Sequence, residues 1–263
     1  MSFEISLRGK PTFIDIEYEE KIGIYGQDFW TLINDNAYES ETFDFIQRTF
    51  VPGAFFFDIG AATGCMSICA AQLGYQVVAF EPQHSVFEAL RRNIALNPDL
   101  LRNTETVYAL VVNSKSQGSK GISDFFTSGA SGPLESLSDS VKRVSMQDLF
   151  HKANLDVKTV FKVDIEGAEF NLLQDAELLS ELKARNSVMY LSLHPGFLTP
   201  LRSKSKFARL VWLVKATLEV ADLYFRLRRY SLIKNNKGTV ELSLVGILRH
   251  LHKDSRDFQI NFQ

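Results

Sequence analysis

The stretch that decides the fold is Phe55-Phe56-Phe57-Asp58-Ile59-Gly60-Ala61-Ala62-Thr63-Gly64. It joins a continuous apolar run of strand length, residues 54–59, to the helical pattern of residues 65–73 through a turn with glycine at both ends. In a doubly wound sheet the first such turn meets the ligand at the carboxyl ends of the strands. Gly60 lets the backbone come close to a ligand, and Gly64 opens a helix whose free N–H groups favour a carboxylate or phosphate. The stretch therefore predicts an α/β fold with a ligand site at this turn.

Apolar runs of strand length alternate with helical patterns along the rest of the chain. Such alternation is typical of a mostly parallel sheet that is covered by helices on both faces. The further predicted strands are residues 76–80, 106–112, 159–163, 187–193, 224–233 and 257–262. The predicted helices are residues 39–50, 65–73, 85–96, 168–182, 206–221 and 241–250. The Ser- and Gly-rich stretch 113–140 interrupts the pattern, and a connection of this length is either functional or disordered.

Residues 3–34 precede this pattern and hold short β-prone runs, 12–18 and 22–25, which glycine and proline interrupt. They predict an N-terminal β-hairpin extension. With 263 residues and 45% hydrophobic content, the chain can fill one large core. We therefore expect a single structural domain, in which residues 1–37 are an extension packed on a domain of residues 38–263.

Composition excludes several classes of function. A formal net charge of -2 gives no general attraction to phosphate polymers, so we expect no nucleic-acid partner. No run is long and apolar enough to predict a transmembrane segment or a secretory signal. Cys65 and Cys69 are the two cysteines, and we interpret them as small core residues because no second ligand pair accompanies them. These features favour a reduced, cytoplasmic setting.

An acid at the end of the second strand narrows the choice of ligand. Glu81 follows the glycine turn at the position where a carboxylate accepts hydrogen bonds from ribose hydroxyls, which adenosyl and dinucleotide cofactors share. The turn lacks the three-glycine spacing of dinucleotide sites. Asp58 would also be badly placed beside a diphosphate and well placed beside a cation. The pattern favours S-adenosylmethionine over NAD, although a ligand-free tight turn and a solvated strand end are the structural alternatives.

Acids and a histidine also follow two later strands. Asp164 comes directly after strand 159–163, and His194 comes directly after strand 187–193, so both side chains are expected at the cleft edge of the sheet. Glu166 and Glu169 lie at the start of the helix that follows, where an acid can also serve simply as a helix cap. The pattern predicts a reaction centre at Asp164 and His194.

Taken together, these stretches resemble the FkbM family of class I methyltransferases. The matching pieces are residues 58–64, 77–82, 93–97, 162–169 and 191–195, in the family's order and over roughly residues 38 to 200. This chain departs from the family pattern at Ala61-Ala62, where the pattern has Ala-Asn, and at Ser192, where it usually has Glu. A family role for that glutamate in orienting the histidine or binding substrate is therefore not carried over.

The resemblance implies a Rossmann-like fold with a seven-stranded, mostly parallel sheet and helices on both faces. It implies O-methylation of a hydroxyl on a small-molecule or glycan acceptor, such as a sugar, a glycolipid or a secondary metabolite. Asp164 and His194 would lie beside the acceptor oxygen, with His194 taking its proton. The residues that would hold S-adenosylmethionine are Asp58, Gly60, Ala61, Thr63, Gly64, Glu81 and Pro82.

Three alternatives stay open at this point. Some related sugar O-methyltransferases use a divalent cation, for which Asp164 and Glu166 could supply oxygen ligands, although we predict no resident metal. A catalytically silent relative that binds S-adenosylmethionine as a scaffold or sensor is a second function class, motivated by Ser192. A nicotinamide-dependent oxidoreductase keeps the fold but conflicts with the glycine spacing.

Two further stretches invite a functional interpretation. Residues 201–230 combine an apolar helical face with several Lys and Arg residues, which suits a cover helix of the sheet or a peripheral contact with anionic lipid. Phe125-Phe126 lies within the stretch 113–140 and is either a lid over the acceptor site or an anchor of that loop. Oligomeric state has no sequence signal here.

Overall fold

The structure is a computed structural model that describes residues 2–114, 141–153, 156–165, 168–194, 206–251 and 256–263. Its strands are β1 (Phe3–Leu7), β2 (Lys10–Ile14), β3 (Phe55–Ile59), β4 (Gln76–Glu81), β5 (Thr104–Tyr108), β6 (Leu110–Val112), β7 (Arg143–Ser145), β8 (Thr159–Val163), β9 (Val188–Ser192), β10 (Ser231–Asn235) and β11 (Asp257–Phe262). Its α-helices are α1 (Ile16–Ile22), α2 (Gln27–Asn34), α3 (Ser40–Thr49), α4 (Cys65–Leu73), α5 (His84–Ala95), α6 (Met146–Leu149), α7 (Glu169–Leu172), α8 (Ala176–Ala184), α9 (Lys206–Leu227) and α10 (Leu244–Leu251). The predicted loop 113–140, with Phe125-Phe126, lies almost wholly outside the described residues.

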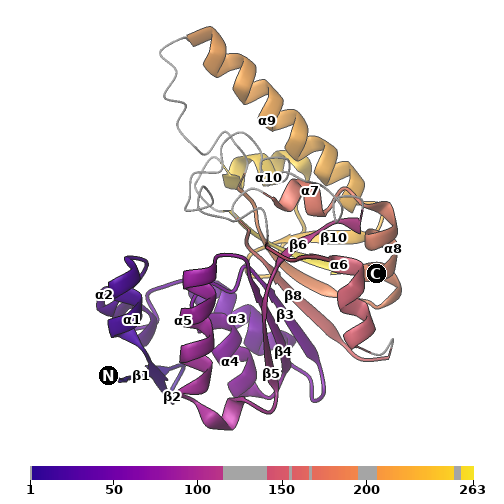
Figure 1. The fold of residues 1–263 in the computed structure, drawn as a ribbon. Coiled ribbons are helices and arrows are strands. Elements are labelled where there is room, and N and C mark those ends of the chain that lie inside the picture. The colour runs from indigo at the N-terminus through magenta and orange to yellow at the C-terminus, as the bar shows by residue number, and fades with distance from the viewer. Residues whose placement is uncertain (1, 115–140, 154–155, 166–167, 195–205, 252–255) are drawn as a thin grey trace.

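A seven-stranded sheet forms the centre of the described molecule, in the order β10-β11-β9-β8-β3-β4-β5 (Figure 1). The pairs among β9, β8, β3, β4 and β5 are parallel, whereas β11 runs antiparallel to both of its neighbours. The chain moves outward from β3 in both directions, to β4 on one side and to β8 on the other. Ligands of such sheets bind outside the carboxyl ends of the strands at this reversal. The sheet confirms the predicted fold class.

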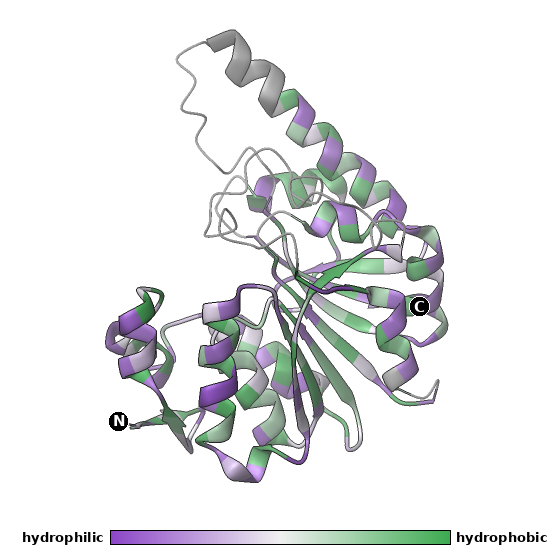
Figure 2. Ribbon diagram, viewed as in Figure 1, coloured by the Kyte–Doolittle hydropathy of each residue, from purple (hydrophilic) through white to green (hydrophobic). Residues whose placement is uncertain are grey.

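Two hydrophobic clusters cover the two faces of the sheet. Alternate residues of β3 separate to the two sides, since Phe56 belongs to the cluster that includes residues of α3, α4 and α5, and Phe57 belongs to the cluster that includes residues of α6, α8, α9 and α10. The strands are largely hydrophobic where helices cover them (Figure 2). Burial on both faces explains why the strands are continuous apolar runs without polar alternation. Of the helices that the structure describes, none combines the length and the apolar character needed to cross a membrane.

The N-terminal hairpin is present, but it is shorter than the β-prone runs suggested. β1 and β2 pair antiparallel, and the chain then enters α1 and α2 in place of further strands. Asp15 ends the strand because its side chain accepts a hydrogen bond from the backbone N–H of Tyr18 and so caps α1. Gly23, in a left-handed conformation, ends the same helix. Local capping thus overrides the β propensity of residues 12–18 and 22–25.

Three other boundaries differ from the sequence-based expectation. The predicted strand 106–112 is two strands, because β6 leaves the main sheet and pairs with β7. The predicted helix 168–182 is split where Asp175 caps α8 through the N–H groups of Glu177 and Leu178. Helix α9 continues to Leu227, so strand β10 begins later than expected, whereas β11 has the expected bounds. Two of these changes split an expected element, and the third moves the boundary between α9 and β10.

Candidate functional site

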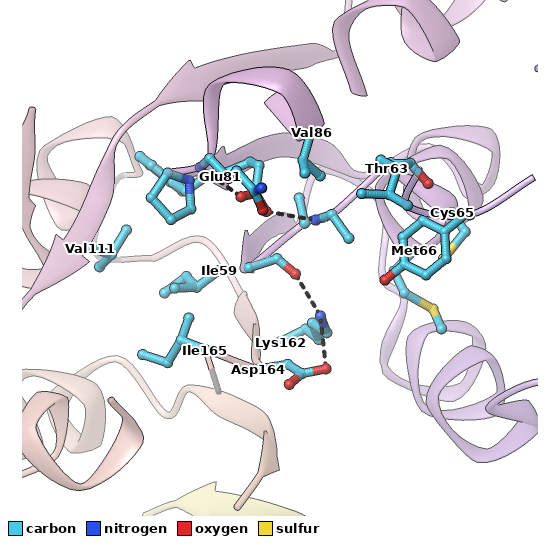
Figure 3. A pocket seen from close by; sticks show the side chains of 18 of the residues that line it. Ile59, Thr63, Cys65, Met66, Glu81, Val86, Val111, Lys162, Asp164 and Ile165 are labelled. Atoms are coloured by element: carbon cyan, nitrogen blue, oxygen red, sulfur yellow. Dashed lines mark hydrogen bonds and ion pairs between the residues drawn. The ribbon is translucent and has the colours of Figure 1, made fainter. Parts of the chain in front are cut away.

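A pocket of about 490 Å³ lies at the carboxyl ends of β3, β4 and β8 (Figure 3). The loop after β3 forms its floor, and the segments 23–25 and 38–39 close it on the side of the N-terminal elements. Six predicted site residues line it: Gly60, Ala61, Thr63, Glu81, Pro82 and Asp164. Asp58, Gly64 and His194 are not among its described lining residues. The switch point of the sheet and the pocket therefore coincide.

The two glycines of the loop have packing roles that the sequence alone did not reveal. Gly60 has φ +82°, and a Cβ there would lie 1.9 Å from the carbonyl oxygen of Asp164. Gly64 has φ +98°, and a Cβ there would lie 2.6 Å from Cδ1 of Leu90 on α5. Both positions need a left-handed backbone and close contact with a neighbouring element. The loop is thereby pressed against the tip of β8 and against α5.

Lys162 organises the charges under the loop. It is register partner to Asp58 across β8 and β3, and its Nζ donates to the carbonyl oxygen of Gly60 at 2.8 Å. The same Nζ lies 3.7 Å from Asp58 Oδ1 and 3.5 Å from Asp164 Oδ2. Burial lowers the pKa of Lys162, but the carboxylates of Asp164, Asp58 and Glu39 outweigh burial and raise it above its usual range. The lysine therefore stays cationic and joins the two predicted acids.

Asp58 is fully buried and is not among the described residues that line the pocket. Its Oδ2 accepts a hydrogen bond from Ser67 Oγ of α4 at 2.6 Å, and burial raises its pKa while Lys162 and Ser67 lower it. Asp58 thus fixes α4 and Lys162 relative to β3. Any effect on a ligand in the pocket would pass through Lys162.

Glu81 reaches the pocket from the end of β4. Its carboxylate accepts hydrogen bonds from the backbone N–H of Ala62 at 3.1 Å and of Gln83 at 2.8 Å (Figure 3). Burial raises its pKa to about 7, although these two N–H groups lower it. The carboxylate is therefore held in place by the backbone before any ligand arrives.

The second group of predicted residues meets at the tips of β8 and β9. His194 Nδ1 lies 2.9 Å from Glu169 Oε1, and His194 Nε2 lies 3.8 Å from Asp164 Oδ1. Glu169 is fully buried, and its Oε1 also accepts the N–H of Ile165 at 3.2 Å. An ionised Glu169 would accept a hydrogen bond from Nδ1–H, and Nε2 would then be the basic nitrogen of the ring. Glu169, which the sequence left open as a helix cap, thus both accepts a backbone N–H just before α7 and contacts the histidine.

The same three residues form one group among the described residues that could hold a metal ion. The ligand atoms of Asp164, Glu169 and His194 all lie within 4.8 Å of one another. Carboxylate oxygens and an imidazole suit several divalent cations. The cation alternative that used Glu166 falls outside the described residues, and the absence of a resident metal stays a prediction.

The residues that close the pocket on its N-terminal side carry no sequence motif that predicts a role for them. Tyr25, Tyr38 and Glu39 line it there, beside Cys65 and Met66 of α4. Glu39 comes just before α3, which packs against α4 and β9. No sequence motif predicts that these residues line the pocket, because their position there depends on how α3 packs on the sheet.

Comparisons with known proteins agree with this architecture. The Methyltransferase FkbM domain matches residues 58–202, more than half of the chain. No curated protein matches the sequence.

Solved structures with a similar fold include three methyltransferases. An rRNA methylase from Streptococcus thermophilus is 10% identical, with a TM-score of 0.39 over 84% of this chain and 95% of that one. Precorrin-6y C5,15-methyltransferase from Geobacter metallireducens GS-15 is 15% identical, with a TM-score of 0.34 over 80% and 75% of the two chains. The glycopeptide N-methyltransferase MtfA, complexed with S-adenosyl-L-methionine, is 18% identical, with a TM-score of 0.32 over 58% and 54%. Likenesses at this level carry no information about the acceptor. By the match of its domain, the chain belongs to the FkbM methyltransferase family.

Proposed function

We propose that this S-adenosylmethionine-dependent methyltransferase acts on oxygen, at a hydroxyl of a sugar, a glycolipid or a secondary metabolite. The observation that supports oxygen as the acceptor is the imidazole of His194, which Glu169 orients at 2.9 Å beside Asp164. A hydroxyl loses its proton when it is methylated, and an imidazole is suited to take up a proton near neutral pH. A neutral amine is already nucleophilic and places no such demand on the site.

The pocket suits the cofactor of this family, S-adenosylmethionine. Its volume of about 490 Å³ lies within the usual range of ligand pockets, about 300–1,000 Å³. Glu81 offers a carboxylate to ribose hydroxyls, and the first turn of α4 offers N–H groups to a carboxylate. The acids around Lys162 outnumber it, which favours a cation and disfavours the diphosphate of a dinucleotide. We propose Gly60, Ala61, Thr63, Glu81 and Pro82 as its contact residues, with Asp58 and Gly64 shaping the loop from below.

Bound S-adenosylmethionine supplies an electrophilic methyl group on a sulfonium. The chain's own residues then have two tasks, to position the acceptor and to move its proton. Nε2 of His194 would take the hydroxyl proton, while Glu169 holds the proton on Nδ1. Asp164 would orient the hydroxyl from the tip of β8, and Lys162 fixes that carboxylate at 3.5 Å.

The test is product analysis with a methyl-labelled cofactor over a panel of sugars, glycolipids and phenolic metabolites. We expect an O-methyl product whose rate of formation falls by about 10²–10⁴ in His194→Ala, with little change in affinity for S-adenosylhomocysteine. His151→Ala, at an exposed histidine, is the matched control. A methyl group on nitrogen or carbon would contradict the proposal, and so would activity of His194→Ala within severalfold of wild type.

A catalytically silent cofactor-binding protein is the second candidate, and Ser192 in place of the usual family glutamate motivates it. Such a protein would bind S-adenosylhomocysteine by calorimetry and yet give no labelled product with any acceptor of the panel. Slow demethylation of the bound cofactor without acceptor would not count as turnover. One O-methylated product therefore excludes this candidate.

Contact with a membrane surface and a cytoplasmic location stay predictions. On α9 the apolar side chains of Val214, Leu218 and Phe225 are 51%, 64% and 60% exposed. However, Arg226 pairs with Asp222 and Arg228 pairs with Glu241, which reduces the free positive charge of this helix. Residues 201–205 of the basic segment, and the side chains of 206–213, lie outside the described part. Flotation with anionic and with neutral liposomes tests the contact. If the protein stays in the bottom fraction, unbound, with both kinds of liposome, the contact is contradicted.

A further inference from the structure

The pocket has two chemically different ends. One end lies toward β4, where Glu81, Val86 and Val111 combine one carboxylate with apolar side chains, as an adenosine requires. The other end lies toward α3 and α4, where Glu39, Lys162 and Asp164 gather charge (Figure 3 shows Lys162 and Asp164 on the far side of the loop from Glu81). A ligand that fills the pocket therefore meets a nucleoside-like end and a charged end.

Glu39 has an unusual conformation for its place in the chain. It immediately precedes α3 with φ 41° and ψ 42°, a left-handed conformation that is uncommon for residues other than glycine, asparagine and aspartate. Its side chain makes no capping hydrogen bond to the helix backbone, accepts one from Thr42 Oγ1 at 3.3 Å, and lines the pocket. Backbone strain of this kind persists where the surrounding structure imposes it, often at binding sites. The strain at Glu39 thus accompanies a carboxylate that lines the ligand cavity.

The charged side chains around Glu39 favour the binding of a cation. Lys162 is shared among Glu39, Asp58 and Asp164, so the three acids exceed the one base by two charges when all are ionised. Burial raises the pKa of Glu39, and Lys162 lowers it. A positive group of a ligand would replace solvent beside this carboxylate and favour its ionised form.

The first turn of α4 lies next to Glu39 and offers the opposite polarity. Cys65, the first residue of α4, lines the pocket, and the carboxylate of Glu39 is close enough to raise the pKa of its thiol further than burial alone. The first N–H groups of any α-helix lack partners within the helix and attract anions. The first turn of α4, which can bind a carboxylate, therefore lies beside Glu39, which can bind an ammonium group.

We propose that Glu39 and the first turn of α4 together bind the amino-acid end of the cofactor, with Glu39 holding its α-ammonium group and the helix N-terminus its α-carboxylate. The proposal rests on the assignment of S-adenosylmethionine to this pocket. It adds a binding residue outside the matched domain, since that match begins at residue 58. It also gives the N-terminal segment a direct part in the site.

The test compares two ligands that differ only at this end. S-adenosylhomocysteine carries the amino-acid group, whereas 5′-methylthioadenosine keeps the adenosine and the sulfur and lacks that group. Calorimetry of the full-length protein with both ligands is compared for wild type, for Glu39→Gln and for Glu41→Gln. Glu41 is the matched control, because it carries the same charge in the first turn of α3 and is not among the described residues that line the pocket.

We expect Glu39→Gln to weaken binding of S-adenosylhomocysteine by about tenfold or more, as for the loss of a charge-assisted hydrogen bond, and to change binding of 5′-methylthioadenosine by less than about twofold. Glu41→Gln should leave both unchanged. An equal loss for both ligands, or no loss for either, would overturn the role of Glu39. If wild type binds neither ligand, the cofactor assignment itself fails, which is a different result from a failure of Glu39.

Discussion

Binding of an adenosine-containing ligand should depend on pH through Glu81. Burial raises the pKa of its carboxyl from 4.5 to about 7, while the N–H groups of Gln83 and Ala62 and the charge of Lys162 lower it. The two oxygens already accept two backbone N–H groups, so they can accept two ribose hydroxyls in addition only when the carboxyl is ionised. Affinity should therefore rise as pH rises through about 7.

The size of the effect follows from the pKa. With a midpoint at about 7, the carboxyl is about one-tenth ionised at pH 6 and about nine-tenths ionised at pH 8, so affinity rises about tenfold, or about 1.4 kcal/mol. In the ligand-free protein the raised pKa has the opposite consequence, because it makes stability fall as pH rises. The fold keeps a proton that the unfolded chain releases between pH 4.5 and 7, so the free energy of unfolding falls as pH rises through that window. Glu81→Gln removes the titrating group, so its free energy of unfolding should not fall between pH 4.5 and 7, although its single amide oxygen can accept only one of the two N–H groups that Glu81 accepts.

Two measurements check this reasoning. Calorimetry with 5′-methylthioadenosine at pH 6, 7 and 8 avoids the titration of an amino-acid group, and urea unfolding at the same pH values reports stability. Glu88→Gln, at a residue of α5 that pairs with Arg91, is the matched control and should behave as wild type in both assays. Equal affinity of wild type at pH 6 and pH 8 would refute the role of Glu81. The same pH slope in Glu81→Gln would refute it as well.

The remaining predictions concern the groups that hold the site in shape. Lys162→Met should destabilise the fold by about 3–5 kcal/mol in urea unfolding, because it removes the cation beside the buried Asp58 and the partly buried Asp164, and a loss below about 1 kcal/mol would contradict the charge arrangement. Gly60→Ala should cost at least about 2 kcal/mol more than Gly53→Ala, since both have left-handed backbones but a Cβ at Gly53 meets nothing within 4 Å. Asn93→Ala should destabilise by about 2–3 kcal/mol, as its side chain joins Glu19 to the carbonyl oxygen of Thr63, and protection of the N-terminal amides in hydrogen exchange should fall with it.

The sequence predicted the sheet and the strand tips well, for a definite physical reason. Continuous apolar runs identify buried parallel strands, and the residue that follows each run must lie at the shared carboxyl edge. Glu81, Asp164 and His194 are found at that edge for this reason. The roles of the loop glycines differed from expectation, because close packing against Asp164 and Leu90 depends on neighbours that are distant in sequence.

Lys162, Glu169 and Glu39 could not be given their roles from sequence. A lysine inside an apolar strand has no predictable role until the strand register is known, and here the register places Lys162 opposite Asp58. Glu169 occupies a helix start, where capping and orientation of a histidine look alike in one dimension. Glu39 depends on the packing of α3 against α4 and β9. The sequence therefore did not predict which side chains these three residues contact, because those contacts depend on how the strands and helices pack together.

The same pairing bears on whether Ser192 leaves the site incomplete. Ser192 of β9 and Asp257 of β11 are register partners, and Ser192 Oγ donates to Asp257 Oδ1 at 2.6 Å. Burial raises the pKa of Asp257, while Ser192, His194 and Lys162 lower it, so this carboxylate lies within electrostatic reach of the proposed base. The antiparallel neighbour thus supplies an acid beside the position where the family pattern has a glutamate on the strand itself. Because Ser192 holds the Asp257 carboxyl group at 2.6 Å, an acid lies beside this strand tip although β9 itself carries none there, which weakens the argument from Ser192 for a catalytically silent chain.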